Sequence, residues 1–459
     1  WPKWVIFMKT YLELLEKGSY GKLLLNLCLP TVVIMIVMVI YNMADTFFVG
    51  QIGNPDMLAA VSLCTPIFTI LSGLGTLFGN GGCTLISLCL GKGEKQKIEY
   101  VNSFCFIGAI CTGLVFMIVV LCSINYLVEL LGCDVNTVEY TKNYFRIIAI
   151  GAPAVMFNGT FCNIIRADGA AISSMICNML GTVLNIVLDA LFILVFNLGV
   201  EGAAWATILG NVASCIYLVY YMKKNGTYSM SLRWHPEIKM VVGKVIAMGL
   251  PLACSTLVMS VSNMISNYMM MQYGSTALAA QGIAGKLGML ISMLAMGVCM
   301  GLQPAMTFAH GRKDRKRIQY IIKNTMVFTF VVGVTIAVLG CIFRKNIINA
   351  FINNPDIMKY GQVMIFGALI VGPIAGWYQL TQVYLQATEN PKYATIVALL
   401  DKGIFYLPIL LVFARVFGVY GIAFAQPVTT IFSLIVGVIF CMQTNKKSVR
   451  LKSTCDMKK

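Results

Sequence analysis

The stretch LLLNLCLPTVVIMIVMVIYNMA, residues 23–44, carries no charged side chain. The next apolar stretch, residues 57–91, is longer and also lacks Asp, Glu, Lys and Arg. Both exceed the roughly 18 apolar residues that mark a candidate transmembrane helix. The pattern recurs along the chain, and hydropathy predicts spans near residues 23–48, 57–90, 101–124, 143–164, 172–196, 199–222, 245–271, 277–308, 320–343, 361–385, 394–416 and 418–442.

The overall composition supports this prediction. Of the 459 residues, 58% are hydrophobic and 11% are charged, whereas a soluble domain has roughly 45–50% apolar and about 25% charged residues. The sequence therefore predicts an all-α integral membrane protein of about twelve transmembrane helices. The net charge of +16 lies in short clusters between apolar stretches, which is typical of membrane topology, and we expect no nucleic-acid partner.

The basic clusters also predict which side of the membrane each loop faces. Lys92, Lys95 and Lys97 follow the second span, and five Lys and Arg residues lie within 312–317 after the eighth span. Loops rich in Lys and Arg face the cytoplasm, so we expect both termini there. The sequence shows no cleavable signal peptide, and Met8 is expected to be the natural start, with the seven residues before it an extension.

The chain contains an internal repeat. LGVEGAAWA at residues 198–206 aligns with FGVYGIAFA at residues 417–425, and Pro30 aligns with Pro251. The repeat predicts two six-helix, pseudo-symmetric lobes that begin on the same side of the membrane. The expected domains are a cytoplasmic N-terminal segment 1–22, a first lobe 23–222, a cytoplasmic inter-lobe loop 223–244, a second lobe 245–442 and a basic cytoplasmic tail 443–459.

Two carboxylates lie deep within spans of the first half. Asp45 follows Asn42 by three residues, and Asp189 follows Asn185 by four, so each has a polar neighbour on its own helical face. An ionisable side chain at mid-membrane costs about 2.5–3.5 kcal/mol on insertion scales and indicates a functional site by default. The alternative is that both carboxylates only pair with other polar groups and hold the helices together.

The second half lacks these carboxylates. The counterparts of Asp45, Asn185 and Asp189 are Ser266, Ile404 and Pro408, so we expect the ion chemistry to be confined to the first half. The deep charges of the second half are those that follow, each open to a structural or a functional interpretation: Lys286, Asp401 and Lys402.

The cysteines and methionines are mostly explained by packing. The cysteines, among them Cys64, Cys89, Cys111, Cys177 and Cys254, show no spacing typical of metal sites, and we interpret them as small buried apolar residues. Methionines cluster at helical spacing and either pack in lipid or line an adaptable substrate pocket. The residues expected to line a substrate cavity are Asn42, Asn263, Met289, Met293 and Gln382.

Five motifs over essentially the whole chain resemble the MATE (multidrug and toxic compound extrusion) transporters, in particular the bacterial branch that includes MepA and DinF. They are LP at 29–30, YNMADTFFVGQIG at 41–53, NIVLDALFILVFNLGVEGAAWAT at 185–207, LQPAMTFAHG at 302–311 and LQATENPKYA at 385–394. The resemblance implies a V-shaped pair of six-helix lobes in a bacterial plasma (inner) membrane, which alternates between inward-open and outward-open forms.

The resemblance also implies a cation site in the first lobe and a bending point at Pro30. The residues implied for the cation site are Asp45, Asn185, Asp189, Thr207 and Tyr144. Another branch of the family places carboxylates on spans seven and ten, but residues 245–271 and 361–385 contain none. A second-lobe cation site of that kind is therefore not expected.

We interpret the protein as a secondary antiporter that exports small organic, often cationic and amphipathic compounds in exchange for protons or sodium. We expect a monomer in the lipid bilayer, without a cofactor. The alternative within the same superfamily is a flippase or exporter of lipid-linked precursors or metabolites, which needs more deep positive charge. An enzyme needs a cluster of catalytic groups, and the sequence shows none, while a channel would show no coupling to an ion gradient.

The coupling ion stays open between H⁺ and Na⁺. Asp45, Asn185 and Asp189 offer the oxygen ligands that sodium requires, yet a close pair of carboxylates also raises one pKa and suits a proton. We favour the proton, because Asn and Thr side chains hydrogen-bond a protonated Asp as well as they bind a metal ion.

Overall fold

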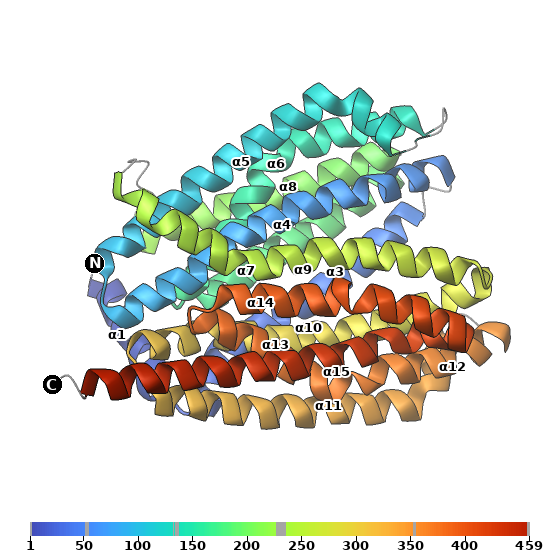
Figure 1. The fold of residues 1–459 in the computed structure, drawn as a ribbon. Coiled ribbons are helices and arrows are strands. Elements are labelled where there is room, and N and C mark those ends of the chain that lie inside the picture. The colour runs from blue at the N-terminus through green and yellow to red at the C-terminus, as the bar shows by residue number, and fades with distance from the viewer. Residues whose placement is uncertain are drawn as a thin grey trace. The chain divides into compact units, whose positions relative to one another are not determined.

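The computed structural model describes residues 2–50, 55–131, 133, 137–225, 236–351 and 355–456, and within them it contains helices and turns but no strand (Figure 1). The α-helices are α1 Pro2–Lys17, α2 Tyr20–Leu23, α3 Leu29–Gly50, α4 Pro55–Lys92, α5 Lys95–Leu130, α6 Val138–Ala167, α7 Ala171–Asp189, α8 Gly199–Asn225, α9 Lys239–Met271, α10 Ser275–Gly311, α11 Arg315–Phe351, α12 Pro355–Ile370, α13 Gly372–Ala387, α14 Pro391–Leu399 and α15 Tyr406–Asp456.

Three of the spans contain a π-helical segment, and a short 3₁₀ turn precedes α9. The π segments are η1 Leu24–Cys28, η2 Ala190–Val195 and η4 Leu400–Ile404, and the 3₁₀ turn is η3 Pro236–Ile238. A π turn widens the helix by one residue and is frequent at functional sites. Two of the three segments adjoin or contain a buried aspartate, Asp189 or Asp401.

Ten helical stretches among the described residues are long and apolar enough to cross a membrane, and the pair α12–α13, bent by 41°, gives one more. The stretch 391–445, which comprises α14, η4 and most of α15, has 55 residues. At about 1.5 Å per residue it is more than twice as long as a bilayer core is thick. Gly418, with φ 60° and ψ −137°, interrupts it. Counted as two spans, this stretch brings the total to twelve, which confirms the predicted fold class.

The bend between α12 and α13 has a local cause. Gly372 and Pro373 begin α13, directly after Val371. Proline lacks an N–H, and its ring disfavours helical geometry in the residue before it, so the pair Gly372–Pro373 favours a break at this point. The carbonyl of Val371 instead accepts from the N–H groups of Ile374 and Ala375, at 3.0 and 2.7 Å. The straight span expected at residues 361–385 is therefore two helices.

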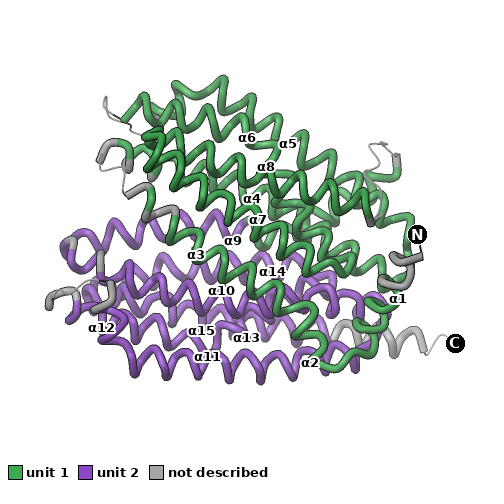
Figure 2. Tube along the Cα trace, turned by 180° about the vertical axis from the view of Figure 1, so that it is seen from behind, with its two compact units in different colours: residues 1–253 green, residues 254–459 purple. Residues whose placement is uncertain are grey.

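The chain forms two compact units, residues 1–253 and 254–459, shown in different colours in Figure 2. In the first, α4, α5 and α6 pack against one another, and α7 packs against α3 and α8. In the second, α10 packs against α12 and α13, and α15 covers α12, α13 and η4. The boundary falls inside α9, because its first turns, with Val241 and Val245, belong to the first unit's core.

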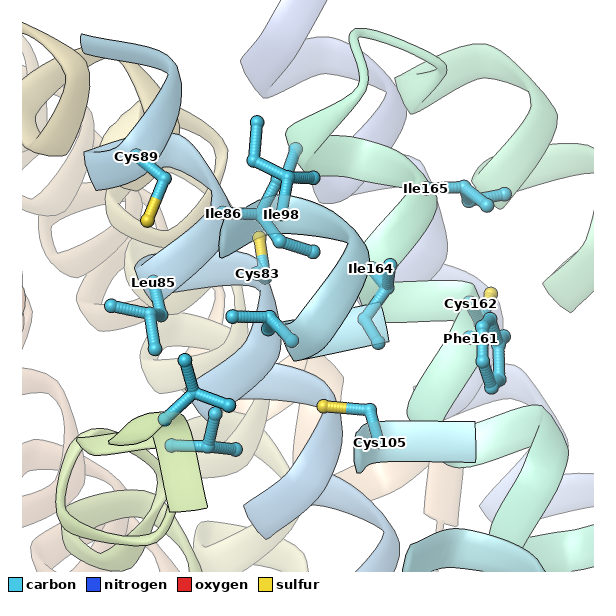
Figure 3. Close-up of a cluster of buried hydrophobic side chains, with 14 of the residues drawn as sticks. Cys83, Leu85, Ile86, Cys89, Ile98, Cys105, Phe161, Cys162, Ile164 and Ile165 are labelled. Carbon is cyan, nitrogen blue, oxygen red and sulfur yellow. The ribbon is translucent and has the colours of Figure 1, made fainter. Parts of the chain in front are cut away.

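Cysteines contribute to that core. Figure 3 shows Cys83, Cys89, Cys105 and Cys162 among isoleucine, leucine and phenylalanine side chains. These thiols are buried, as are three of the five cysteines that the sequence analysis names, Cys64, Cys89 and Cys177. Cys254 is half-buried and Cys111 is exposed. In a membrane, lipid would cover Cys111 as the protein core covers the buried thiols. Small apolar packing, as expected, accounts for most of them.

The N-terminal segment contains a packed helix. From α1, Met8, Tyr11 and Leu15 are buried, and the Tyr11 hydroxyl donates to the carbonyl of Arg166 at 3.4 Å. Tyr11 lies against Gly169, whose φ of 87° and lack of a Cβ both make room for the ring. The turn between α6 and α7 therefore receives α1.

Candidate functional site

The first unit holds a buried polar cluster between α7 and α8. Asn185 and Asp189 lie four residues apart on α7, so they share one face of the helix. Thr207 lies opposite them on α8, one turn beyond Ala203, whose carbonyl accepts from the Thr207 hydroxyl at 3.0 Å. Asp189 has no exposed surface, and Asn185 and Thr207 are 3% and 7% exposed.

The amide of Asn185 joins these residues. With its nitrogen toward Asp189, Asn185 donates to Asp189 Oδ2 at 3.1 Å, and its oxygen accepts from the backbone N–H of Thr207 at 3.1 Å. The opposite orientation satisfies only a weak 3.4 Å bond to the Thr207 hydroxyl. We adopt the first, because amide orientation is assigned by the hydrogen bonds it satisfies. The buried carboxylate is thus held by a donor on its own helix.

Asp189 lies where α7 changes into the π segment η2. The N–H of Ala190 still bonds to Ile186 and Val187, after which the wider turn begins. From η2, Ile193 is buried with Ala203 of α8, and Phe48 of α3 packs against this pair. The side chain of Asp45 lies outside the described residues, but its helix, α3, packs on α7, η2 and α8 around this cluster.

The polar cluster extends further than the sequence analysis predicted. Asn211, one turn after Thr207 on α8, donates to the carbonyl of Thr207 at 2.8 Å. Asn158 on α6 donates to Asn211 Oδ1 at 2.9 Å. These two half-buried asparagines connect the site to a third helix. The spacing of Asn211 from Thr207 was a usable signal, whereas nothing local in the sequence marks Asn158.

The structure groups three of the implied cation ligands, Asn185, Asp189 and Thr207. Tyr144 of α6 is half-buried among the apolar residues around Phe145 and Ile148. Its neighbour Asn143 donates to Glu201 of α8 at 2.8 Å.

Pro30 lies at the start of α3, directly after the π segment η1. Proline's ring clashes with the carbonyl four residues earlier in a regular helix. The π turn, in which the N–H of Leu29 bonds to Leu24, relieves this crowding. The expected bending point is therefore a place where the helix already departs from regular geometry.

The residues expected to line a substrate cavity differ in exposure. Asn42 is exposed and donates to the carbonyl of Met38 on its own helix at 2.7 Å, and Asn263 is also exposed. Met289 and Met293 are half-buried on α10. Gln382 is buried and donates to the hydroxyl of Tyr378 in the second unit.

Comparison with known proteins identifies relatives over most of the chain. The chain is 31% identical over 411 residues to the multidrug export protein MepA of Staphylococcus saprophyticus subsp. saprophyticus. This alignment covers 89% of this chain and 91% of the relative. It is 29% identical over 408 residues to a protein of the same name from Staphylococcus aureus, covering 89% and 90%.

Solved structures share the fold. One is the outward-facing conformation of a multidrug resistance MATE family transporter of the MOP superfamily, with a TM-score of 0.86, 23% identity and coverage of 94% of this chain and 98% of the other. Another is a MOP superfamily transporter from Pyrococcus furiosus, with a TM-score of 0.85, 23% identity and coverage of 94% and 97%.

The family model described as MatE matches residues 30–191 and 251–410, one match in each half of the repeat. The two matches together cover more than half of the chain, and they include Pro30 and Asp189. With about twelve spans in two units and multidrug exporters as relatives, this chain belongs to the MatE family of transporters.

Proposed function

We propose that the protein is a secondary antiporter that exports small organic, often cationic and amphipathic compounds in exchange for an inward-moving cation, H⁺ or Na⁺. Its relatives named multidrug export proteins support the export of small organic molecules. The observation that carries the coupling mechanism is the fully buried carboxylate of Asp189, which accepts from the amide of Asn185, itself bonded to the backbone N–H of Thr207.

The physical basis of coupling is the cost of a buried charge. An ionised carboxylate within a membrane protein is costly unless a cation or hydrogen-bond donors compensate it. Binding of a proton or a sodium ion at Asp189, with Asp45 of the neighbouring α3 as its proposed partner, removes that charge. Because α3 and α7 carry π segments beside Pro30 and Asp189, neutralisation can shift their packing. By linkage, the substrate and the ion then disfavour each other's binding.

With its amide oriented as these hydrogen bonds assign it, Asn185 suits a proton at Asp189. Its nitrogen faces Asp189, while its oxygen is already engaged by the backbone of Thr207. An amide in this orientation donates a hydrogen bond to the carboxylate and offers no oxygen to a metal ion beside it. Sodium requires several oxygen ligands, and the amide would have to turn around to provide one.

The test is transport by everted membrane vesicles, with a fluorescent organic cation as substrate and a proton or a sodium gradient imposed in turn. Asp189→Asn is expected to abolish gradient-driven export with expression and folding near normal. The matched control is Asp314→Asn, the same chemical change at an exposed residue that caps α11 by accepting from the N–H of Arg317 at 2.9 Å; asparagine caps equally well.

Normal transport by Asp189→Asn would refute the ion site. Export that depends on sodium alone would refute the proton but not the site. Export by the wild type without any imposed gradient, at the same rate, would refute antiport itself.

A further inference from the structure

The second unit contains a buried carboxylate surrounded by donors. Asp401, in η4, has no exposed surface. Thr430 of α15 donates to its Oδ1 at 3.0 Å, and Gln426 lies 3.5 Å from both of its oxygens. The ammonium of Lys402 lies 2.8 Å from Oδ2.

This ion pair lies within the π turn. In an α-helix, consecutive side chains point in different directions and do not meet. Asp401 and Lys402 are consecutive, and both lie in η4, where the N–H of Phe405 bonds five residues back to Leu400 at 3.0 Å. Their contact at 2.8 Å is therefore made between neighbouring residues of the wider turn. The carbonyl of Lys402 accepts a hydrogen bond from the hydroxyl of Ser262 of α9, which supports the turn.

The surrounding positions are those that form the polar cluster of the first unit. Residues 198–206 align with 417–425, so at the same offset Thr207 corresponds to Gln426 and Asn211 to Thr430. In both halves these two positions lie on the helix that faces the aspartate-bearing helix. The second half thus has polar residues at the same two positions as the first. Its carboxylate lies at a different place on the corresponding helix.

The two side chains of the ion pair differ in their exposure. The side chain of Asp401 is 1% exposed, whereas that of Lys402 is 22% exposed. The ammonium can therefore withdraw along its flexible stem, while the carboxylate cannot leave its donors. An ammonium held against a buried carboxylate has the position and the charge that a bound monovalent cation would have.

We propose that Asp401 forms a second monovalent-cation site, in the second unit, and that the ammonium of Lys402 occupies it as a tethered ion. The proposal rests on the proposed antiport function. It implies that the external coupling ion cannot bind in the second unit while Lys402 is in place. Only the first unit then binds the coupling ion. Removal of the ammonium opens the site to sodium or a proton.

The experiment compares full-length Lys402→Met with the double variant Asp401→Asn/Lys402→Met, both purified in detergent. Methionine keeps the apolar stem of lysine and removes its charge. Melting temperature is measured with NaCl replaced stepwise by choline chloride, at pH 5.5 and at pH 8. Both variants keep the first-unit site, so a difference between them reports on Asp401 alone.

On addition of Na⁺ at pH 8, or on acidification without Na⁺, the melting temperature of Lys402→Met is expected to rise by about 3 °C more than that of the double variant. The shifts that come from the first-unit site and from Asp168 are common to all three proteins, and neither the double variant nor the wild type should show the additional rise. If Lys402→Met proves unstable in choline, then Na⁺, acid pH or ethylammonium should restore it. A Lys402→Met protein that none of the three stabilises, while the double variant folds, would show that the pair is only a structural ion pair.

This outcome is separable from that of the antiport proposal. Failure of the antiport would appear as normal transport by Asp189→Asn, whereas failure of the tethered-ion proposal appears in equilibrium melting without any transport.

Discussion

At the scale of the residue, Asn185 makes two hydrogen bonds in the first-unit site. It donates to Asp189 and accepts from the backbone N–H of Thr207, both at 3.1 Å. Asn185→Ala removes both hydrogen bonds and deprives the buried Asp189 carboxylate of this donor, at a cost of about 1–3 kcal/mol. We expect the half-saturating concentration of the coupling ion in vesicle transport to change by about tenfold.

The control for this prediction lies on the same helix. Asn178 is seven residues earlier on α7 and bonds to the carbonyl of Ser174 at 2.9 Å, away from Asp189. Asn178→Ala should leave the ion dependence of transport unchanged. Equal changes in the two variants would indicate a general effect on α7.

A second residue-scale prediction concerns Asp168, in the turn between α6 and α7. It is 3% exposed, and burial raises its pKa to about 8, against about 3.9 in an unfolded chain. Between about pH 3.9 and pH 8, the carboxyl of Asp168 is protonated in the folded state and ionised in the unfolded state. The neutral carboxyl therefore contributes stability at low pH that is lost as pH rises toward 8, by at most about 1.4 kcal/mol per unit.

Asp168→Asn cannot titrate, so its melting temperature should fall less than that of the wild type between pH 5 and pH 8. Above pH 8 the two curves should run parallel. Thermal unfolding in detergent at a series of pH values measures this, and parallel curves over the whole range would contradict it.

At the scale of the element, Gly418 divides the stretch 391–445 into two spans. Its φ of 60° with ψ of −137° is a conformation that other residues rarely adopt. Space is not the obstacle, because an added Cβ would make only ordinary contacts with Tyr273, at 3.8 Å. Gly418→Ala should cost about 1–3 kcal/mol through backbone strain alone and lower the melting temperature by several degrees.

Gly282 is the matched control in the same unit. It lies inside α10, with nothing within 4 Å of an added Cβ. Gly282→Ala should be neutral or stabilise the protein by up to about 1 kcal/mol, because alanine favours helix. If both alanine variants melt alike, Gly418 does not need its special backbone conformation.

At the scale of the whole molecule, the basic clusters predict its orientation. Lys313 lies in the turn between α10 and α11, and Asn197 lies between η2 and α8, both at positive φ. We expect Lys313 to face the cytoplasm and Asn197 the outside. In intact cells a membrane-impermeant maleimide should label Asn197→Cys but label Lys313→Cys only after permeabilisation. The wild type gives the background from native cysteines, and the reverse pattern would invert the proposed topology.

The sequence by itself determined the apolar spans, the duplication and the family. Uninterrupted apolar stretches have no stable alternative to a membrane, and hydropathy is a local property of the chain. The i, i+4 relation of Asn185 and Asp189 could also be read directly, since helical geometry makes it a local property. The assignment of Thr207 to the site came from the family resemblance, and the structure shows only that its backbone N–H bonds to Asn185.

Only the tertiary structure decided which polar groups meet. The contact between Asn158 and Asn211 joins residues on separate helices, and the direction of the Asn185 amide follows from its partners. The repeat predicted ion chemistry in the first half alone and left the role of the pair Asp401–Lys402 open. The structure places this pair in a π turn, with donors from α15 beside the carboxylate. Such features arise from packing between distant segments, and no local pattern in the sequence records them.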